Sequence, residues 1–377
     1  MTPPLYENHQ APDNRPDGCN AGLWFERFFD QFDDKWKVGD EKAKWLKDNF
    51  NRNAGVDNQL KAHAIQQLQL AESLGGKGNV FQTEFHFVTG MGNPHPVENG
   101  LSWHPTMGVP YLSGAAVKGL IRSWLEVWEK ETDDEQQKKK LLHWFGSTGK
   151  NPQEEGYESG IGGLIFFDAF PIEPVQMNVD IMTPHMGKWY EKGGDIKKIE
   201  TEPEKIPADW HKPTPIPFLV VKEARFLFTI APRHKKCSVT IDQAMKVLED
   251  SLDYMGAGAK TAVGYGQMTV AVDGFAPLKD VLEKLKRKEK MQKMSPEKQQ
   301  LTELQEMFAR DKAVGDKTAG NPTCERLLKL IKKAESWRQV DKEELADLGE
   351  AIYGFVGWGK NPKKKKRKAM LSALRGE

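Results

Sequence analysis

The sequence predicts an α+β fold with a mostly antiparallel sheet, and two observations carry this prediction. Short apolar segments with strand character alternate with two long helical segments, residues 115–128 and 241–254, through the middle of the chain. After residue 275 the sequence becomes helical and rich in Lys and Glu. We therefore expect a ferredoxin-like core with a large insertion, followed by a helical extension.

The composition is typical of a water-soluble globular protein, since 38% of the 377 residues are hydrophobic and 29% are charged. No run of about 18 apolar residues is present, so we expect no membrane-spanning helix. Met1–Pro4 lack the basic and apolar regions of a secretory signal. The three cysteines, Cys19, Cys237 and Cys324, are far apart, which suits a reducing cytoplasm and excludes a CxxC metal site. We expect no cofactor.

The charge is spread unevenly along the chain. From residue 271 onward there are 25 Lys and Arg against 17 Asp and Glu, a net charge of +8. The remainder has 30 against 37, a net charge of −7. This basic C-terminal third predicts a polyanionic partner or an acidic neighbouring subunit.

The N-terminal region begins with residues 1–20, which are rich in Pro, Asn and Asp and predict a flexible arm. Residues 22–75 are expected to be helical, because aromatic side chains recur at helical spacing from Trp24 to Phe32 and a further helix fits residues 62–74. Such an aromatic stripe is typical of core packing or of a partner-facing surface, and base stacking is the less common use.

The first core helix, residues 115–128, carries the first candidate phosphate ligands. Ser113 is its expected N-cap, with Gly114 beside it, and Lys118 and Arg122 share one face four residues apart. A helix N-terminus that follows a Gly/Ser loop attracts phosphate. These residues are therefore candidate phosphate ligands, and a merely solvated basic face is the alternative.

Four segments predict core strands besides the one that ends the core: residues 80–88, 162–170, 218–221 and 226–231. Asp168 lies in the second of them and is either a catalytic group or a residue that ends the strand or caps a loop. Residues 175–217 are expected to be a long insertion with weak secondary structure. Their aromatic, Met and Lys residues suit single-stranded nucleic acid.

Residues 255–266 form a glycine-rich loop between the helix at 241–254 and an expected strand at 267–272. Glycine permits positive φ and close backbone approach, and successive N–H groups can then form a concave anion site. A phosphate fits this description, and a tight structural turn is the alternative. Ala259 stands where a Walker motif requires Gly, and the helix–loop–strand order is reversed, so we exclude ATP binding. The candidate ligands are Gly256, Gly258, Lys260, Thr261, Gly264 and Gly266.

The C-terminal third predicts a long charged helix or helix pair at 278–308 and further helices at 324–336 and 342–355. The basic run Lys363–Lys368 follows. It is either a nucleic-acid-binding tail or the solvated start of a helix.

The histidines do not occur with the spacing of metal ligands, so we expect no metal site. His104 and His185 lie in predicted loops and are candidate acid/base groups for RNA cleavage. A hydrogen-bonding role is the commoner use of a lone loop histidine.

Several of these segments together resemble the RAMP superfamily of CRISPR proteins. Residues 108–122, GVPYLSGAAVKGLIR, are similar to the motif at that family's first helix, although Ser113 stands where the family usually has Pro. Residues 256–266 are similar to its signature glycine-rich loop. The resemblance covers roughly residues 80–270.

Three further segments look more narrowly like the family of sixth subunits of the Cmr complex, the type III-B RNA-guided effector. They are residues 92–101, 179–185 and 207–217. The resemblance implies an RRM-like core at 76–275 that contains the insertion at 175–217. It leaves an N-terminal arm and aromatic-rich helical region at 1–75 and a helical C-terminal extension with a basic tail at 276–377.

The resemblance also implies a function. The protein would be a structural, non-enzymatic subunit in the cytoplasm, without membrane contact, that binds guide RNA and caps the 3′ end of an effector filament in antiviral defence. Its partners would be guide and target RNA and the first, backbone and small helical subunits of the complex. The RNA ligands would be the helix and loop residues named above, together with His104 and His185.

Two other functions fit the same residues. One is a RAMP-type endoribonuclease that processes guide RNA with His104 or His185 as its base. The other is a protein–protein scaffold without RNA contact.

Overall fold

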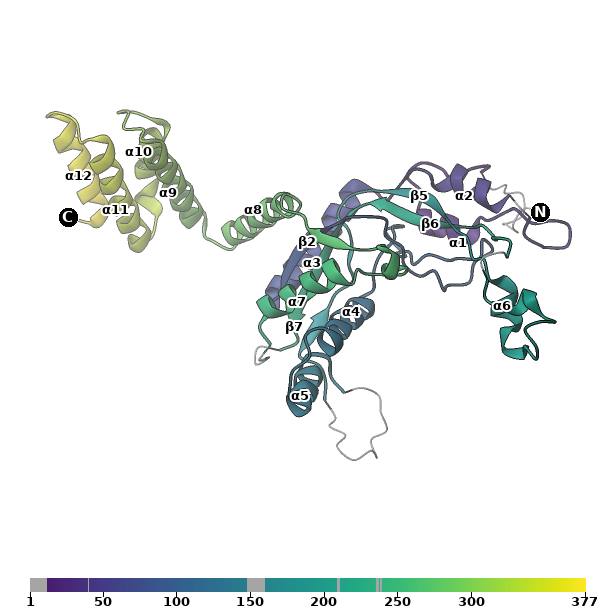
Figure 1. Ribbon diagram of the computed structural model, residues 1–377. Helices are drawn as coiled ribbons and strands as arrows, with labels where there is room; N and C mark the ends of the chain where they lie inside the picture. Colours follow the sequence, from purple (N-terminus) through teal and green to yellow (C-terminus); the bar gives the residue numbers. More distant parts are fainter. Residues whose placement is uncertain (1–11, 40, 148–159, 209–210, 235–236, 238) are drawn as a thin grey trace. The chain divides into compact units, whose positions relative to one another are not determined.

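The structure is a computed structural model that describes residues 12–39, 41–147, 160–208, 211–234, 237 and 239–377. The chain forms two compact units, Met1–Leu282 and Glu283–Glu377 (Figure 1). The boundaries predicted at residues 75 and 275 divide the chain more finely and stay predictions.

The first unit contains both helices and strands, interspersed along the chain. Its helices are α1 (Ala21–Arg27), α2 (Lys42–Phe50), α3 (Asp57–Ser73), α4 (Gly114–Val127), α5 (Asp134–Phe145), α6 (Gly187–Lys192), α7 (Ile241–Tyr254) and the start of α8 (Ala276–Gln292). Its strands are β1 (Asn53–Ala54), β2 (Lys77–Thr83), β3 (Leu164–Phe166), β4 (Phe170–Pro171), β5 (Val175–Met182), β6 (Ile216–Glu223), β7 (Arg225–Pro232) and β8 (Met268–Val270). Short 3-10 turns are η1 (Gly193–Asp195), η2 (Pro203–Lys205) and η3 (Thr261–Val263).

The larger sheet has the strand order β3-β7-β2-β8, and β4 also pairs with β7. Each of these pairs is antiparallel. Helix α4 lies in the chain between β2 and β3, and α7 lies between β7 and β8. This is the β-α-β-β-α-β arrangement of a ferredoxin-like core, with the first and third strands in the centre. The predicted α+β class is confirmed.

Helices cover both faces of this sheet, because the side chains of β2 and β7 alternate. Phe81, Phe226 and Phe228 belong to the buried cluster that includes the inner faces of α4 and α7. Val80 and Leu227 point the other way and pack with α3 and the start of α8. The sheet is therefore buried on both sides and holds α4 and α7 together on one of them.

The smaller sheet corrects the prediction for residues 175–217. The sequence predicts weak secondary structure there, yet Val175–Met182 is β5 and Ile216 begins β6. The two strands pair antiparallel from Met177 with Val221 onward, β1 pairs with β5, and α2 packs on the sheet. The pairing joins segments far apart in sequence, which a local pattern does not reveal.

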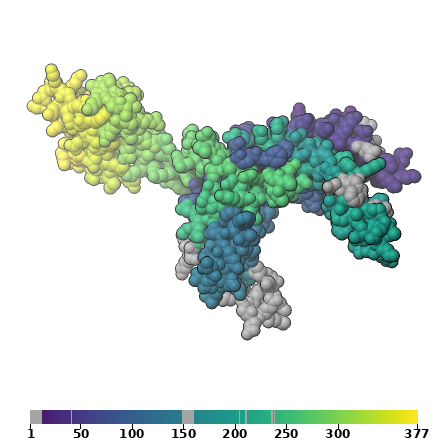
Figure 2. All heavy atoms as spheres, viewed as in Figure 1, coloured from purple at the N-terminus to yellow at the C-terminus, as the bar shows by residue number. Residues whose placement is uncertain are grey.

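Between β5 and β6 the chain makes an excursion that carries α6, η1 and η2. A hydrogen bond of 3.1 Å from the Thr214 N–H to the carbonyl oxygen of Pro184 joins the two ends of this excursion. Figure 2 shows its atoms, in teal, as a lobe that projects from the first unit. Trp210, one of the aromatic residues expected to contact RNA, lies outside the described residues.

Two predicted strands end earlier than expected. Residues 80–88 were expected to form one strand, but β2 ends at Thr83, and Phe87 pairs with Val221 of the smaller sheet instead. Residues 162–170 divide into β3 and β4, because the chain leaves the sheet at Phe167–Ala169. The side chain of Asp168, in that gap, accepts a hydrogen bond from the start of α4, as described below.

The N-terminal helices pack into the core of the first unit. Trp24, Phe25 and Phe29 are buried in the same cluster as β5 and β6, which confirms the core interpretation of the aromatic stripe. The predicted flexible arm is wrong for its described part. Arg15 is buried, and its backbone N–H and side chain donate to Asn49 and Asn53.

The second unit is a bundle with its own buried core. It contains the end of α8 and the helices α9 (Pro296–Val314), α10 (Pro322–Lys333), α11 (Gln339–Val356) and α12 (Lys363–Arg375), with a 3-10 turn η4 (Ala334–Ser336). The helix pair predicted at 278–308 is α8 and α9, which separate before the N-cap Ser295. The basic run 363–368 is the start of α12. Among the described residues, no helix is long and apolar enough to cross a membrane.

Candidate nucleic-acid interface

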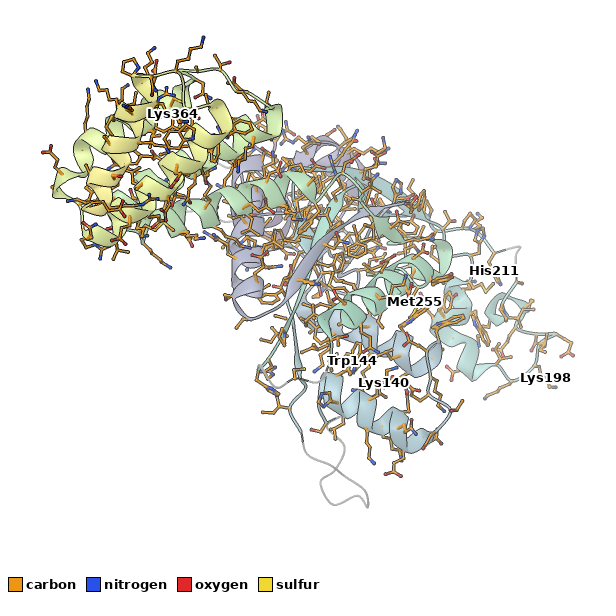
Figure 3. The ribbon with its side chains drawn as sticks, turned by 90° about the vertical axis from the view of Figure 1, so that its left-hand side faces the viewer. Lys140, Trp144, Lys198, His211, Met255 and Lys364 are labelled. Carbon is orange, nitrogen blue, oxygen red and sulfur yellow. The ribbon has the colours of Figure 1, made fainter. Side chains whose placement is uncertain are left out.

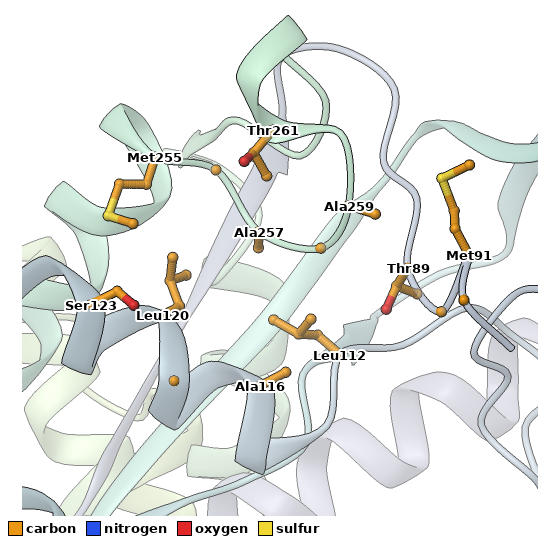
Figure 4. A pocket seen from close by; sticks show the side chains of 15 residues that line it. Thr89, Met91, Leu112, Ala116, Leu120, Ser123, Met255, Ala257, Ala259 and Thr261 are labelled. Atoms are coloured by element: carbon orange, nitrogen blue, oxygen red, sulfur yellow. The ribbon is translucent and has the colours of Figure 1, made fainter. Parts of the chain in front are cut away.

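Three segments of the first unit meet around a groove of about 470 Å³ (Figure 4). They are the loop that follows residue 88, the start of α4, and the glycine-rich loop. None of the side chains that line the groove is charged, and most are small. The lining residues are Thr89, Gly90, Met91, Gly92, Leu112, Ala116, Gly119, Leu120, Ser123, Met255, Gly256, Ala257, Gly258, Ala259 and Thr261.

The glycine-rich loop owes its course to glycines at positions where a side chain would not fit. Gly258 has a φ of +92°, and a Cβ there would lie 2.2 Å from the carbonyl oxygen of Val88. Gly266 has a φ of +72°, and its Cβ would lie 1.9 Å from the carbonyl oxygen of Ala257. Residues with a Cβ rarely adopt this left-handed region, and here they would also collide with the backbone.

Several amides of this loop are already used inside the protein. The Ala257 N–H donates to Gly266 and the Ala259 N–H to Val88, each at 2.8 Å. The N–H groups of Gly264 and Gly266 donate to Thr261 and His86. An anion site made of these four amides is therefore not present. At these positions the loop is a tight turn, and the anion-binding role of the other candidate residues stays a prediction.

A half-buried polar contact fastens the loop to the smaller sheet. The Tyr265 hydroxyl donates to Asp180 Oδ2 of β5, and His86 Nδ1 lies 3.3 Å from the same oxygen. Burial would raise the pKa of Asp180, but hydrogen bonds from Tyr265, from the Ile181 N–H and from His86 outweigh it and lower this pKa. Burial and the neighbouring carboxylate raise the pKa of Tyr265.

The N-terminus of α4 already holds a carboxylate. Ser113 is its N-cap, as predicted, and its side chain accepts from the Ala116 N–H. Asp168 Oδ1 accepts from the Gly114 N–H at 2.7 Å. Gly114 is needed because a Cβ would lie 2.2 Å from the Phe166 carbonyl oxygen. The side chain of Asp168 therefore caps this helix, and a phosphate at the same N–H would meet its negative charge.

Lys118 and Arg122 lie against α5 and not in the groove. Lys118 Nζ donates to the carbonyl oxygen of Phe145 at 2.7 Å, at the C-terminal end of α5. Arg122 Nε donates to Glu126, and its guanidinium carbon is 5.9 Å from the centre of the Phe145 ring. Burial, together with the cations of Arg122 and Arg233, lowers the pKa of Lys118. These contacts fasten α5 to α4, and the role of both residues as RNA ligands stays a prediction.

The two polar residues predicted within the glycine-rich loop are placed differently. Thr261 lines the groove. Lys260 has a φ of +59°, and its Nζ lies 5.4 Å from the centre of the Phe218 ring and 3.8 Å from Met182 Sδ. The side chain of Lys260 is thus half-buried against the smaller sheet. Its neighbours in the sequence, Ala259 and Thr261, both line the groove.

The two candidate histidines, His104 and His185, differ in exposure and in their neighbours. His185 is exposed in the excursion after β5. His104 is half-buried, and its Nδ1 accepts from the Met107 N–H at 3.3 Å. The His63 ring of α3 lies 5.3 Å from the His104 ring, a neighbour that the sequence did not indicate. Burial lowers the pKa of both His63 and His104.

Sequence reasoning missed most of the groove wall on α4. Ala116, Gly119, Leu120 and Ser123 line it, at the spacing of one helix face. A stripe of small residues on an otherwise amphipathic helix is the signal that could have found them. No cluster of three or more metal-ligating side chains occurs among the residues that the structure describes.

Comparisons with known proteins match the central part of the chain. The family model of the RAMP superfamily matches residues 71–269, just over half of the chain. A curated relative from Pyrococcus furiosus, CRISPR system Cmr subunit Cmr6, is 28% identical over 236 residues, which cover 50% of this chain and 66% of the relative. CRISPR system CMR subunit Cmr6 from Saccharolobus solfataricus is 28% identical over 173 residues, 45% of this chain and 47% of the relative.

Solved structures of lower similarity also match. A cryo-EM structure of the type III-B Cmr-beta complex bound to cognate target RNA contains a chain with 19% identity and a TM-score of 0.41, covering 61% of this chain and 70% of that one. The crystal structure of Cmr6 from Pyrococcus furiosus has 24% identity and a TM-score of 0.30, covering 52% of this chain and 98% of that one.

Proposed function

The chain belongs to the RAMP superfamily, and on that premise we propose that it is a non-enzymatic, guide-RNA-binding subunit of a type III-B CRISPR effector complex. It would cap the 3′ end of the effector filament, beside the first, backbone and small helical subunits and the target RNA. The family match and the two curated relatives named as Cmr6 subunits support the assignment to this kind of complex.

The groove between α4 and the glycine-rich loop is the observation that carries the proposed RNA contact. Its walls come from the same segments that resemble the family's motifs, and Gly90, Gly92, Gly119 and Gly258 present no side chain there. A sugar–phosphate backbone can therefore approach the protein backbone closely. In a guide-based system, contacts to backbone and shape suffice, because base pairing reads the sequence.

The chemistry of the groove suits contacts to sugar and phosphate oxygens without a concentrated positive charge. Thr89, Ser123 and Thr261 supply hydroxyl groups, which donate hydrogen bonds to such oxygens. Lys260 lies between the lining residues Ala259 and Thr261, whereas the side chains of Lys118 and Arg122 contact α5. We therefore expect the groove to position the guide, with Lys260 rather than Lys118 or Arg122 as the nearby charge.

Gly119 offers the sharpest test, because it lines the groove on α4 and a Cβ there meets no atom within 4 Å. We would compare Gly119→Glu, Gly119→Gln and Gly119→Lys in the tagged chain, purified from its native cells at moderate salt. Ala115→Glu, on an exposed residue of α4 outside the groove, is the matched control. The readout is the guide RNA and the partner subunits recovered per mole of chain.

If guide phosphates pass the groove, Gly119→Glu lowers the recovered RNA roughly tenfold, Gly119→Gln lowers it less, and Gly119→Lys retains it, because only the charge differs. An equal loss in all three variants, with partner subunits also lost, indicates a protein segment in the groove and favours the scaffold function. Full RNA recovery in every variant overturns the proposed contact.

The endoribonuclease remains a second candidate because of the pair His63 and His104, whose rings are 5.3 Å apart. Two neighbouring histidines can serve as base and acid in RNA cleavage. Incubation of the purified chain with repeat RNA in a chelator tests this function. Cleavage that His104→Ala and His63→Ala each abolish, while His185→Ala retains it, would establish an enzyme.

A further inference from the structure

The C-terminal bundle has one strongly basic end. Hydrogen bonds and ion pairs join the start of α9 to the start of α11, the end of α9 to the start of α10, and the start of α11 to the end of α12. The end of α9, the start of α10, the end of α11 and the start of α12 therefore lie at one end of the bundle. Contacts between cations and aromatic rings mark this meeting point, because Lys317 lies over Phe355 and Arg367 lies over Tyr353. The basic side chains at this end are Lys312, Lys317, Lys360, Lys363, Lys364, Lys365, Lys366, Arg367 and Lys368.

The acids at this end do not neutralise these cations. Asp311 Oδ2 accepts from the side chain of Asn321, and Asp316 accepts from the Thr318 N–H. Neither is paired with a lysine of α12. The positive charge is therefore left open to solvent, and Lys364, labelled on the bundle in Figure 3, is exposed.

The start of α12 is electrostatically unfavourable as it stands. Lys363–Lys366 are exposed at the N-terminal end of the helix, where the helix dipole disfavours cations. The first turn contains no acid, and Pro362 offers no side-chain cap. In the part of the chain that the structure describes, the ammonium groups of these four lysines make no side-chain hydrogen bond or ion pair. A bound polyanion would reduce both the repulsion among these lysines and their unfavourable interaction with the helix dipole.

The opposite end of the bundle differs, because acidic side chains lie among its cations and pair with two of them. Lys298 pairs with Asp341 and Glu344, and Arg375 pairs with Asp347 and Glu350. The basic end is thus not a general property of a lysine-rich bundle. It is a local excess of charge.

Aromatic residues accompany the lysines at the basic end. Trp358 and Phe355 are each partly exposed, and Lys368 Nζ lies 5.7 Å from the centre of the Trp358 ring. Lysines that follow a phosphate backbone, combined with aromatic faces on which bases stack, are the usual means of binding single-stranded nucleic acid. Trp358 also packs on the bundle core, with its ring 5.5 Å from that of Tyr353, so the ring is held in place beside the lysines. An acidic protein surface would use the charge alone, whereas single-stranded RNA would use both the charge and the partly exposed ring.

We propose that the basic end of the C-terminal bundle binds single-stranded RNA. This site lies outside residues 71–269, which the family model matches. It is separate from the groove of the first unit and stands or falls independently of the function proposed for that groove.

The test uses the full-length chain and a fluorescein-labelled oligouridylate of about 15 nucleotides, a length that such sites span. The triple variant Lys364→Ala, Lys365→Ala, Lys366→Ala is compared with Lys329→Ala, Lys332→Ala, Lys333→Ala. Both remove three exposed lysines of the same bundle, but the second set lies on the later part of α10, away from the basic end. Affinity is measured against salt concentration for each protein.

The variant in α12 is expected to lower the slope of log Kobs against log[salt] by about 2, since each phosphate contact to a single strand contributes about 0.7. The control variant should keep the wild-type slope. The α12 variant should also raise the midpoint of bundle unfolding slightly, because it removes cations from a helix N-terminus. This readout shows that lost binding is not lost folding. Equal slopes for both variants would overturn the proposal.

Crosslinking separates this site from the groove. A 4-thiouridine oligomer is crosslinked to the full chain, and the modified peptides are identified. Crosslinks near Trp358 that Trp358→Ala and the α12 variant both remove support the proposal. Crosslinks confined to the first unit would overturn the proposed site on the bundle and leave the groove proposal standing. Crosslinks confined to residues 355–368 would support the site on the bundle and count against the groove.

Discussion

Tyr265 and Asp180, 85 residues apart in sequence, share a hydrogen bond that joins the glycine-rich loop to β5. The hydroxyl of Tyr265 donates and the carboxylate of Asp180 accepts, with His86 on the same oxygen. The loop is thereby tied to the smaller sheet as well as to the strand–helix core. One wall of the groove depends on this contact.

Removing that hydrogen bond should destabilise the first unit. Tyr265→Phe keeps the buried ring but removes one of the donors to the carboxylate, and we expect a loss of about 1–2 kcal/mol in the free energy of unfolding. Urea denaturation of the first unit measures it. Tyr254→Phe, at a ring that is 75% exposed, is the control and should change little. The hydrogen bond stabilises the fold only while the Asp180 carboxylate is ionised, and it lowers the pKa of that group. The difference in free energy of unfolding between Tyr265→Phe and wild type should therefore shrink as the pH falls below 3.8, the ordinary pKa of Asp.

Acidification should also destabilise the first unit through His95. Its Nε2 lies 2.8 Å from the Phe25 carbonyl oxygen and its Nδ1 accepts from the Val97 N–H, which fits the neutral ring with hydrogen on Nε2. Burial lowers the pKa of His95, and the bond to Phe25 offsets this only in part. The stabilisation is therefore complete above the ordinary value of 6.5 and is lost as the pH falls through the lowered pKa.

The measurement is the urea midpoint of the first unit between about pH 7.5 and 5. His95→Gln, which can still donate to Phe25 but does not titrate, should flatten the dependence on pH. His185→Gln, at an exposed residue of the excursion after β5, is the control for the substitution itself. If the urea midpoints of wild type and His95→Gln fall in parallel with pH, the His95 ring does not cause the loss of stability in acid.

Two glycines of the loop should respond differently to alanine. Gly264 has a φ of +91° but open space around its Cβ position, so Gly264→Ala should cost roughly 1–2 kcal/mol from the backbone conformation alone. Gly258→Ala adds a collision with the Val88 carbonyl oxygen and should cost about 3–4 kcal/mol. Equal losses in equilibrium unfolding would show that the loop moves away from residue 88 at little cost.

Lys118 should matter to α5 more than to RNA. Lys118→Met keeps the aliphatic stem but loses the donor to the Phe145 carbonyl, so amide hydrogen exchange in α5 should become faster by an amount equivalent to about 1 kcal/mol. Guide RNA recovery should remain near that of wild type. Loss of RNA with unchanged exchange in α5 would restore the sequence-based prediction that Lys118 binds phosphate.

The sequence predicted those parts of the fold that local patterns determine. The helix at 241–254 has the predicted bounds, and Ser113 is the predicted N-cap, because side-chain periodicity and capping act within a few residues. The α+β class follows from the order of such elements. The position of the glycine-rich loop between helix and strand was predicted for the same reason.

The sequence could not predict what depends on distant contacts. Val175–Met182 becomes a strand only because β6 pairs with it, across an excursion of more than thirty residues. Lys118 and Arg122 share a helix face, as predicted, but their spacing does not reveal that α5 covers that face. The loop amides were expected to be open to an anion, and only the folded chain brings Val88 and His86 to them. Whether the remaining candidate residues contact RNA stays a prediction.

The internal hydrogen bonds of the glycine-rich loop affect how fast a ligand binds in the groove and leaves it. A wall whose amides already donate to Val88, His86 and Gly266 has little conformational entropy left to lose when the groove is filled. Association should then be a single bimolecular step, limited by diffusion and orientation, without a slow rearrangement. Differences in affinity between ligands of this groove should accordingly lie in the rate at which they leave.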